Sequence, residues 1–334
     1  MNDGVPMLFV QPQIAVTALP FLAFAASAGL LAWLLRSGRA HRWALDQPNH
    51  RSLHTEPTPR VGGLGIVAGV LLTTVLLGQQ LLAGLVLRLA VVSWFDDRGH
   101  VSIPVRLGVQ FMAIIVWVVV QVPDGWLPGV VAVFALVWMA NLYNFMDGSD
   151  GLAGGMAVFG FGACGVAAWS AGNDAFALLN VSVAAAALGF LRFNFPPARV
   201  FMGDAGSVPL GFLAGAVGLA GWLQQAWPLW FPVLVFSPFV VDASTILLKR
   251  MLCREKFWIA HREHYYQRLV RMGWSHRRLA LAEYALMAAC GASALALLHA
   301  GNGLQMLGLA LWIAAYAGVM QLIDSRWAGR GDPP

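Results

Sequence analysis

Apolar runs of membrane-spanning length recur from residue 14 to residue 323, with only short polar interruptions. A helix needs about 20 apolar residues to cross the hydrocarbon core of a bilayer. Charged residues make up only 11% of the 334 residues, against roughly 25% in soluble domains. A water-soluble fold is therefore excluded. The chain has more basic than acidic residues, with 21 Lys and Arg against 16 Asp and Glu. In a membrane protein this excess indicates which loops face the cytoplasm, and we expect no nucleic-acid partner.

The runs are continuous and contain Gly and Ala, which is typical of helices, whereas membrane β-strands alternate polar and apolar residues over about ten positions. We predict an all-α fold, a polytopic membrane helix bundle. No repeat or linker divides the chain, so residues 1–334 form one integral membrane domain with cytoplasmic catalytic loops. The eleven expected spans are residues 14–35, 61–78, 81–95, 105–121, 128–145, 152–171, 175–191, 207–222, 228–248, 280–298 and 303–323.

The Lys and Arg residues predict the orientation, because cytoplasmic loops are enriched in them. If the N-terminus lies outside, 20 of the 21 Lys and Arg residues fall on the inner side, and only Arg88 falls within a span. The outer loops contain none. We therefore expect the N-terminus outside and the C-terminus in the cytoplasm.

Carboxylates are costly in a membrane chain unless they are solvated or paired, so acids that cluster at one side are informative. Asp96 and Asp97 directly follow an apolar run, at the expected inner boundary. A solvated helix end is an equal alternative for this pair. Asp204 follows Gly203 at the expected start of a helix, where a carboxylate can hold a hard cation while backbone N–H groups face an anion.

A second polar series occupies residues 141–150, where polar side chains recur every third residue. On a helix, steps of three stay close to one face, so Asn141 and Asn144 can share a side with Asp147. Asp150 continues the spacing, and the neighbouring glycines end the helix and let the backbone approach a ligand. Folding alone does not require four polar groups in register, which favours a binding site.

Two basic loops on the same side also carry candidate groups. The first is rich in Pro and Gly, which a loop needed only for topology would not require. In the second, two histidines stand at i and i+3, a spacing that zinc ligands can use, but phosphate contact is favoured because no further His or Cys is nearby in sequence. The candidates are Arg51, His54 and Arg60 in the first loop and His261, Arg262 and His264 in the second.

Carboxylates with Asn suit Mg²⁺, and Arg with His suits phosphate, so the combination predicts phosphoryl chemistry on a lipid. A polytopic lipid or sugar transporter is the alternative from another class. A transporter is expected to place its polar groups near the bilayer midplane. Here the acids lie at the ends of the expected spans.

Five separated motifs carry a resemblance to a known family. They are Asp46-x-Pro-Asn-x-Arg51-Ser-Leu-His54 with Pro59-Arg60-x-Gly62-Gly63, then Asp96-Asp97 with Arg106-Leu107, Asn141-x-x-Asn144-x-x-Asp147-Gly-x-Asp150-Gly-Leu-Ala, Phe201-Met-Gly-Asp204-x-Gly-Ser, and the histidine loop. In this order, over residues 46–269, the chain resembles the polyprenyl-phosphate N-acetylhexosamine-1-phosphate transferases (glycosyltransferase family 4). The resemblance implies a membrane fold of ten or eleven helices. It also implies transfer of a sugar-1-phosphate from a UDP-N-acetylhexosamine to undecaprenyl phosphate in the bacterial inner membrane, with release of UMP.

The resemblance also implies a role for each matching residue. Asp204 matches the magnesium-binding aspartate, with Asp147 as a second ligand of Mg²⁺ and Mn²⁺ as an alternative cation. Asp96 and Asp97 match the essential acidic pair, and His264 completes the expected catalytic set. We favour Asp97 as a base, or else as a positioning group. The expected substrate-binding residues are Arg51, His54, Arg60, Asn141, Asn144, Asp147, Asp150, His261 and Arg262.

The histidine loop departs from the family pattern Asp-Arg-x-His-x-His-His. Here His261 stands at the Asp position, His264 at the first His, and Tyr266 and Gln267 at the other two. The loop looks like that of the subgroup that starts O-antigen or related surface-glycan lipids. The alternative is the transferase for UDP-MurNAc-pentapeptide in peptidoglycan synthesis. The identity of the N-acetylhexosamine and the presence of a homodimer stay open.

Overall fold

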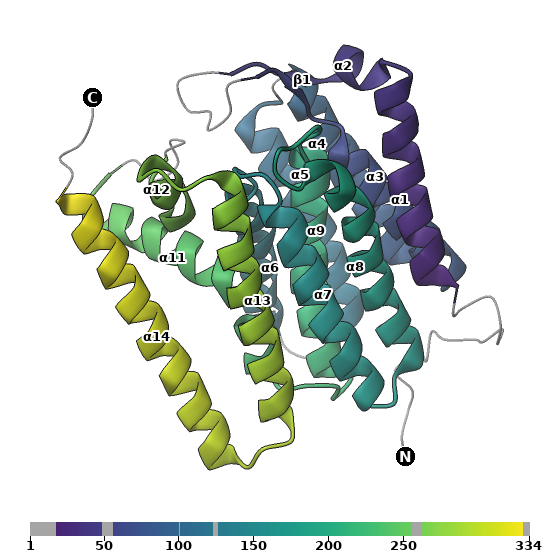
Figure 1. Ribbon diagram of the computed structural model, residues 1–334. Coiled ribbons are helices and arrows are strands. Elements are labelled where there is room, and N and C mark those ends of the chain that lie inside the picture. The colour runs from purple at the N-terminus through teal and green to yellow at the C-terminus, as the bar shows by residue number, and fades with distance from the viewer. Residues whose placement is uncertain (1–17, 49–55, 100, 123–125, 256–261, 330–334) are drawn as a thin grey trace.

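The computed structural model describes residues 18–48, 56–99, 101–122, 126–255 and 262–329. In these ranges it is a helix bundle with one pair of two-residue strands (Figure 1), which confirms the all-α class. The elements are α1 (Leu19–Arg36), α2 (Arg39–Trp43), β1 (Leu45–Asp46), β2 (Thr58–Pro59), α3 (Gly62–Leu76), α4 (Gln80–Gly99), α5 (Ile103–Gln121), α6 (Trp126–Phe145), α7 (Leu152–Ser170), α8 (Asp174–Asn194), α9 (Asp204–Leu223), α10 (Trp230–Val235), α11 (Ser237–Leu252), α12 (Tyr265–Arg271), α13 (His276–Leu298) and α14 (Asn302–Ala328).

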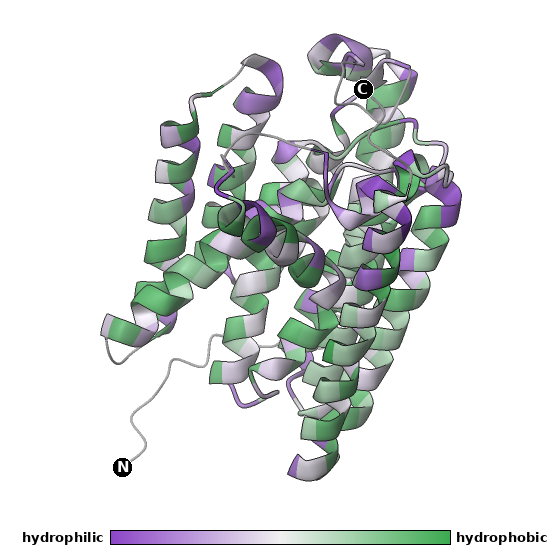
Figure 2. Ribbon diagram, turned by 90° about the vertical axis from the view of Figure 1, so that its left-hand side faces the viewer, coloured by the Kyte–Doolittle hydropathy of each residue, from purple (hydrophilic) through white to green (hydrophobic). Residues whose placement is uncertain are grey.

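Eight helices in the described ranges are long and apolar enough to cross a membrane, so the chain is a multi-pass membrane protein. Apolar residues occupy most of the middle of these helices, and hydrophilic residues lie mainly toward their ends (Figure 2). The eight are α1, α5, α6, α7, α8, α9, α13 and α14. The other expected spans are also helical, but α3 has only 15 residues, α4 ends in charged residues, and the span at 228–248 is divided. The count of eleven is therefore not confirmed.

The prediction of one continuous helix over 228–248 is wrong. The helix divides at Phe236 into α10 and α11. Pro238 lies in the first turn of α11, where its missing N–H costs nothing, whereas inside a continuous helix the proline would remove a hydrogen bond. Figure 1 shows α11 running obliquely to the long helices.

A backbone ladder joins the start of α3 to the segment before α9. The N–H of Phe201 donates to the carbonyl of Pro59 at 2.8 Å. The N–H groups of Gly62 and Gly63 donate to the carbonyls of Phe201 and Met202, each at 2.8 Å. Two segments about 140 residues apart in sequence are thereby held as one unit at one end of the bundle.

Close packing between α3 and α9 depends on glycine. A Cβ atom added at Gly63 would stand 2.3 Å from the backbone nitrogen of Gly206, so the helices would have to separate. We expect Gly63→Ala to destabilise the folded protein by roughly 1–3 kcal/mol, the usual cost of overpacking. The measurement is thermal unfolding of the purified protein in detergent.

Gly84→Ala is the matched control, because Gly84 lies inside α4 and a Cβ atom there would have nothing within 4 Å. Alanine is the better helix former, so this variant should be as stable as the wild type or slightly more. Equal unfolding temperatures for the two variants would contradict the packing argument.

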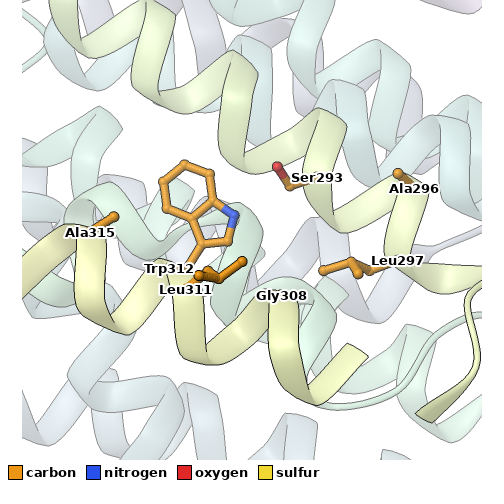
Figure 3. Close-up of a pocket in the computed structure, with 7 residues that line it drawn as sticks. All are labelled: Ser293, Ala296, Leu297, Gly308, Leu311, Trp312 and Ala315. Atoms are coloured by element: carbon orange, nitrogen blue, oxygen red, sulfur yellow. The ribbon is translucent and has the colours of Figure 1, made fainter. Parts of the chain in front are cut away.

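The last helix, α14, stands away from the main bundle over most of its length (Figure 1). Of its 27 residues, Ile323 is the one that is buried. A groove of about 460 Å³ separates it from α13, between Ser293 and Leu297 on one side and Gly308, Leu311 and Trp312 on the other (Figure 3). The hydroxyl of Tyr316, in the middle of α14, lies 2.7 Å from that of Ser237 on α11, so α14 is attached there and near its C-terminal end.

Candidate active site

The start of α9 forms the centre of the candidate site. The carboxylate of Asp97, at the end of α4, accepts hydrogen bonds from the N–H groups of Asp204 at 3.1 Å and Ala205 at 3.0 Å. α9 begins at Asp204, directly after Gly203 with φ of 70°. The predicted helix start after this glycine is therefore confirmed, and two motifs 107 residues apart meet there.

Arg106 of α5 connects the two acidic motifs. Its guanidinium bonds the carboxylate of Asp96 and also lies 3.2 Å from an oxygen of Asp204. The N–H of Val101 donates to the other oxygen of Asp96 at 2.8 Å. Asp96 is thus neutralised by a cation and a backbone donor, and the same cation partly neutralises Asp204.

Asp147 joins the cluster from the α6–α7 loop. Burial, and next the negative charges of Asp204 and Asp97, raise the pKa of the Asp147 carboxyl well above its ordinary value. The N–H of Gly203 hydrogen-bonds this carboxylate and partly offsets the rise. Asn144, one turn earlier, accepts a hydrogen bond of 2.8 Å from the hydroxyl of Ser207 on α9. The negative charge gathered here favours a cation nearby.

One detail of the 141–150 prediction is wrong. α6 ends at Phe145, so Asp147 lies in a turn, with its N–H donating to the carbonyl of Asn144 at 3.2 Å, and does not share a helix face with Asn141. The side-chain amide of Asn141 donates to Gln110 of α5 at 2.8 Å. Asn141 therefore joins α6 to α5.

Arg60 adds positive charge on the side of α3. Its guanidinium lies 2.9 Å from the carboxylate of Asp46, so the pair closes the short β1–β2 hairpin. The charge of Arg60 also lowers the proton affinity of Asp147, which indicates that the two groups are near each other.

His264 is held by a buried carboxylate of α11 that the sequence reasoning missed. Nδ1 of His264 lies 3.1 Å from Oδ1 of Asp242. The two oxygens of Asp242 also accept the N–H groups of Tyr265 and Tyr266, each at 3.1 Å. His264 is the N-cap residue of α12 and is 5% exposed. Asp242 therefore fixes both the ring and the first turn of α12.

α12 packs directly against the loop that carries Asp147. The hydroxyl of Tyr266 donates to the carbonyl of Phe145 at 3.1 Å, and the rings of Phe145 and His264 stack with centroids 6.3 Å apart. Burial and the charges of Asp242 and Asp147 raise the pKa of Tyr266, so its hydroxyl stays protonated as a donor. The histidine loop and the acidic cluster thus form one site.

Two other predicted residues make different contacts. Asp150 accepts the N–H of Ala198 at 3.0 Å and lies 3.9 Å from Nδ1 of His276, so it fixes the loop before α9. Arg262 begins the last described stretch, and its carbonyl accepts a long hydrogen bond of 3.5 Å from Arg271. The predictions for Arg51, His54 and His261 lie outside the described residues.

The sequence did carry a signal for Asp242. It is an isolated carboxylate inside the apolar run Phe239–Ile246, and an ionisable residue within a membrane segment marks a functional site by default. Arg106 and Ser207 stand in the quoted motifs, but their contacts were not predicted. Each of them, like Gln110, contacts a residue more than 30 positions away.

Hard oxygen ligands are available here for a cation. Within the described residues, no group of three or more His, Cys, Asp or Glu side chains converges as a complete metal cage. Mg²⁺ rarely uses such a cage, because it keeps several waters and binds one or two carboxylates together with substrate phosphates. Asp147 and Asp204 fit this kind of binding.

Comparison with known proteins identifies a family model and several relatives. The family model described as glycosyl transferase family 4 matches residues 80–221. A probable undecaprenyl-phosphate N-acetylglucosaminyl 1-phosphate transferase of Bacillus subtilis is 31% identical, covering 72% of this chain and 74% of the relative. An undecaprenyl-phosphate alpha-N-acetylglucosaminyl 1-phosphate transferase of Yersinia pestis is 30% identical, over 70% and 71% of the two chains.

A relative with a different donor is equally similar. The phospho-N-acetylmuramoyl-pentapeptide-transferase of Geobacillus thermodenitrificans is 30% identical, over 69% of this chain and 80% of the relative. Identity alone therefore does not distinguish the two kinds of donor. The family is common to all three relatives: this membrane protein belongs to glycosyl transferase family 4, the polyprenyl-phosphate N-acetylhexosamine-1-phosphate transferases.

Proposed function

We propose that the protein transfers N-acetylhexosamine-1-phosphate from a UDP-N-acetylhexosamine to undecaprenyl phosphate and releases UMP, as the first step of O-antigen or related surface-glycan synthesis. The observation that carries the proposal is the grouping of Asp147 and Asp204 with Arg106 and His264 at one end of an apolar bundle. The relatives from Bacillus subtilis and Yersinia pestis are named as transferases of this kind.

The reaction has to bring two anions together. An oxygen of the lipid phosphate bonds to the β-phosphorus of the donor while the bond from that phosphorus to the bridging oxygen breaks, and UMP leaves with the electron pair. Neutralisation of charge is the main need in such transfers. Arg106 lies 3.2 Å from Asp204, and the charge of Arg60 acts on Asp147, so both guanidinium groups would contact phosphate oxygens.

We assign Mg²⁺ to Asp204 and Asp147, with Mn²⁺ as an alternative. When bound, the cation would neutralise the diphosphate of the donor. The two carboxylates suit this assignment because the charge of one raises the proton affinity of the other, and a cation between them would relieve that repulsion.

Asp97 fits a positioning role better than a base. Both of its oxygens accept backbone N–H groups at the start of α9. A phosphate monoester has a second pKa near 6 and is already largely dianionic at pH 7, so the acceptor needs little help to lose a proton. The positioning role would keep Asp204 at the correct place.

The site is assigned to the cytoplasmic side of the bacterial inner membrane, with the N-terminus in the periplasm and the C-terminus in the cytoplasm. The support is the distribution of Lys and Arg, of which 20 of 21 fall on that side of the expected topology. UDP-sugars are made in the cytoplasm, so the donor would reach the site directly.

Purified protein should form radiolabelled lipid and UMP from undecaprenyl phosphate and a UDP-N-acetylhexosamine when Mg²⁺ is present. The donor panel should include UDP-GlcNAc, UDP-GalNAc and UDP-MurNAc-pentapeptide, because relatives of both kinds are similar. We expect a UDP-N-acetylhexosamine to be used and EDTA to stop the reaction. Absence of labelled lipid with every donor would favour a transporter, and use of UDP-MurNAc-pentapeptide alone would place the protein in peptidoglycan synthesis.

A further inference from the structure

The carboxylate of Asp324, near the C-terminal end of α14, collects donors from two other helices. Lys249 of α11 lies 2.6 Å from Oδ2, and Arg268 of α12 lies 2.8 Å from Oδ1. The hydroxyl of Tyr265, also on α12, donates to Oδ2 at 3.2 Å. Two of the three donors belong to the helix that His264 begins.

α12 needs such support because it is short. It has seven residues, and helices below about 12 residues are marginal in water without tertiary contacts. Asp242 holds its first turn through the N–H groups of Tyr265 and Tyr266. Asp324 holds the same turn from the opposite helix, through the side chains of Tyr265 and Arg268.

Apolar and aromatic contacts surround this ion network. Ile246, Tyr265 and Ile323 form a small buried cluster apart from the main core. The guanidinium of Arg271 lies 4.6 Å from the ring centre of Trp327. A single exposed ion pair contributes little, but one carboxylate with three donors beside a buried cluster forms a fixed joint.

We propose that Asp324 is a positioning residue, which fixes α12 and thereby sets His264 against the Asp147 loop. Elsewhere α14 contacts α13 beside the groove (Figure 3), and the hydroxyl of Tyr316 lies 2.7 Å from that of Ser237 on α11. The joint at Asp324 is where α14 is attached to α12. The catalytic consequence rests on the proposed transferase function, whereas the attachment of α12 does not.

Hydrogen exchange of the full chain in detergent tests the attachment without an activity assay. In Asp324→Ala, the amides of residues 265–271 should exchange about tenfold faster than in the wild type, because one side of the joint is lost. The amides of α8 should not change. Arg326→Gln is the matched control, because this exposed neighbour on α14 also changes the charge by one. Unchanged exchange in α12 would overturn the proposal, whether or not the protein is active.

A double-mutant cycle tests the connection to His264. Asp324→Ala should lower turnover about tenfold in the wild-type background, and Asp324→Glu should recover most of it. In the His264→Ala background, Asp324→Ala should change turnover less than twofold, because the group that it positions is already absent. A general folding defect would instead multiply the two losses. Two outcomes would overturn the positioning role. One is that the losses from Asp324→Ala and His264→Ala multiply, and the other is that Asp324→Ala fails to lower turnover when His264 is present.

The two proposals fail in different ways. If the wild type forms no labelled lipid with any donor, the proposed function fails, and the exchange measurement still decides whether Asp324 holds α12. If the wild type is active and Asp324→Ala has wild-type turnover and exchange, the positioning role fails alone.

Discussion

Asp204→Asn should lower turnover at least about 10²-fold, and added Mg²⁺ should recover little of it. Loss of a residue that only hydrogen-bonds a metal ligand typically lowers metal affinity or activity about 10–100-fold. Asp204 would bind the metal directly. The change keeps the shape of the side chain and the hydrogen bond of its N–H to Asp97. Turnover of purified protein across a Mg²⁺ titration measures the loss.

Asp174→Asn is the matched control for this prediction. Asp174 is also an acid in the first turn of a long helix, but α8 starts at the opposite end of the bundle from the site, and its side chain is exposed. Its substitution should leave turnover within twofold of the wild type. Near-wild-type turnover of Asp204→Asn at ordinary Mg²⁺ concentration would refute the assignment of the cation.

His264→Ala should lower turnover by about 10²-fold, which is the range for loss of one preorganised donor. With Nδ1 at 3.1 Å from Asp242, a phosphate contact has to use Nε2. His264→Gln keeps a donor and should retain more activity than His264→Ala, while His261→Ala should be milder than both. Membranes with matched expression provide the comparison.

The buried position of His264 requires two controls. Asp242→Asn keeps the shape of the partner but weakens its acceptors, so it should lower turnover in the same direction as His264→Ala and by less. His41→Ala removes an exposed histidine of α2 and should have no effect. Equal activities for His264→Ala, His264→Gln and the wild type would leave the phosphate contact without support.

The apolar runs predicted where helices occur. A helix that crosses the hydrocarbon core needs about 20 apolar residues in a row, and such runs can be read directly from the sequence. The break at Phe236 was not predicted, since Pro238 stands inside an otherwise apolar run and hydropathy does not distinguish a kink from a span. α12 was not predicted as a helix either. Its seven residues are stabilised by Asp242 and Asp324, which lie on other helices.

The candidate site was predicted as a set of motifs, and its contacts were not. Each motif carries polar residues that a membrane bundle does not need, so the motifs could be found individually. The pairing of Asp97 with the start of α9 joins residues 107 positions apart. The spacing of residues along one helix does not predict contacts between segments so far apart in sequence. The same limit explains why Arg106 was quoted in a motif but was not recognised as the bridge between Asp96 and Asp204.

The direction of the helices has a consequence for anion binding that does not depend on side chains. α3, α7 and α9 all begin at the site, at Gly62, Leu152 and Asp204. Aligned peptide groups give each helix start the equivalent of about half a positive charge. The carboxylate of Asp97 already caps the start of α9, so the positive ends of α3 and α7 are the ones that would still favour an anion in variants that lack Arg60 or Arg106. The peptide dipoles of these two helices thus supply a positive potential that substitution of Arg60 or Arg106 does not remove.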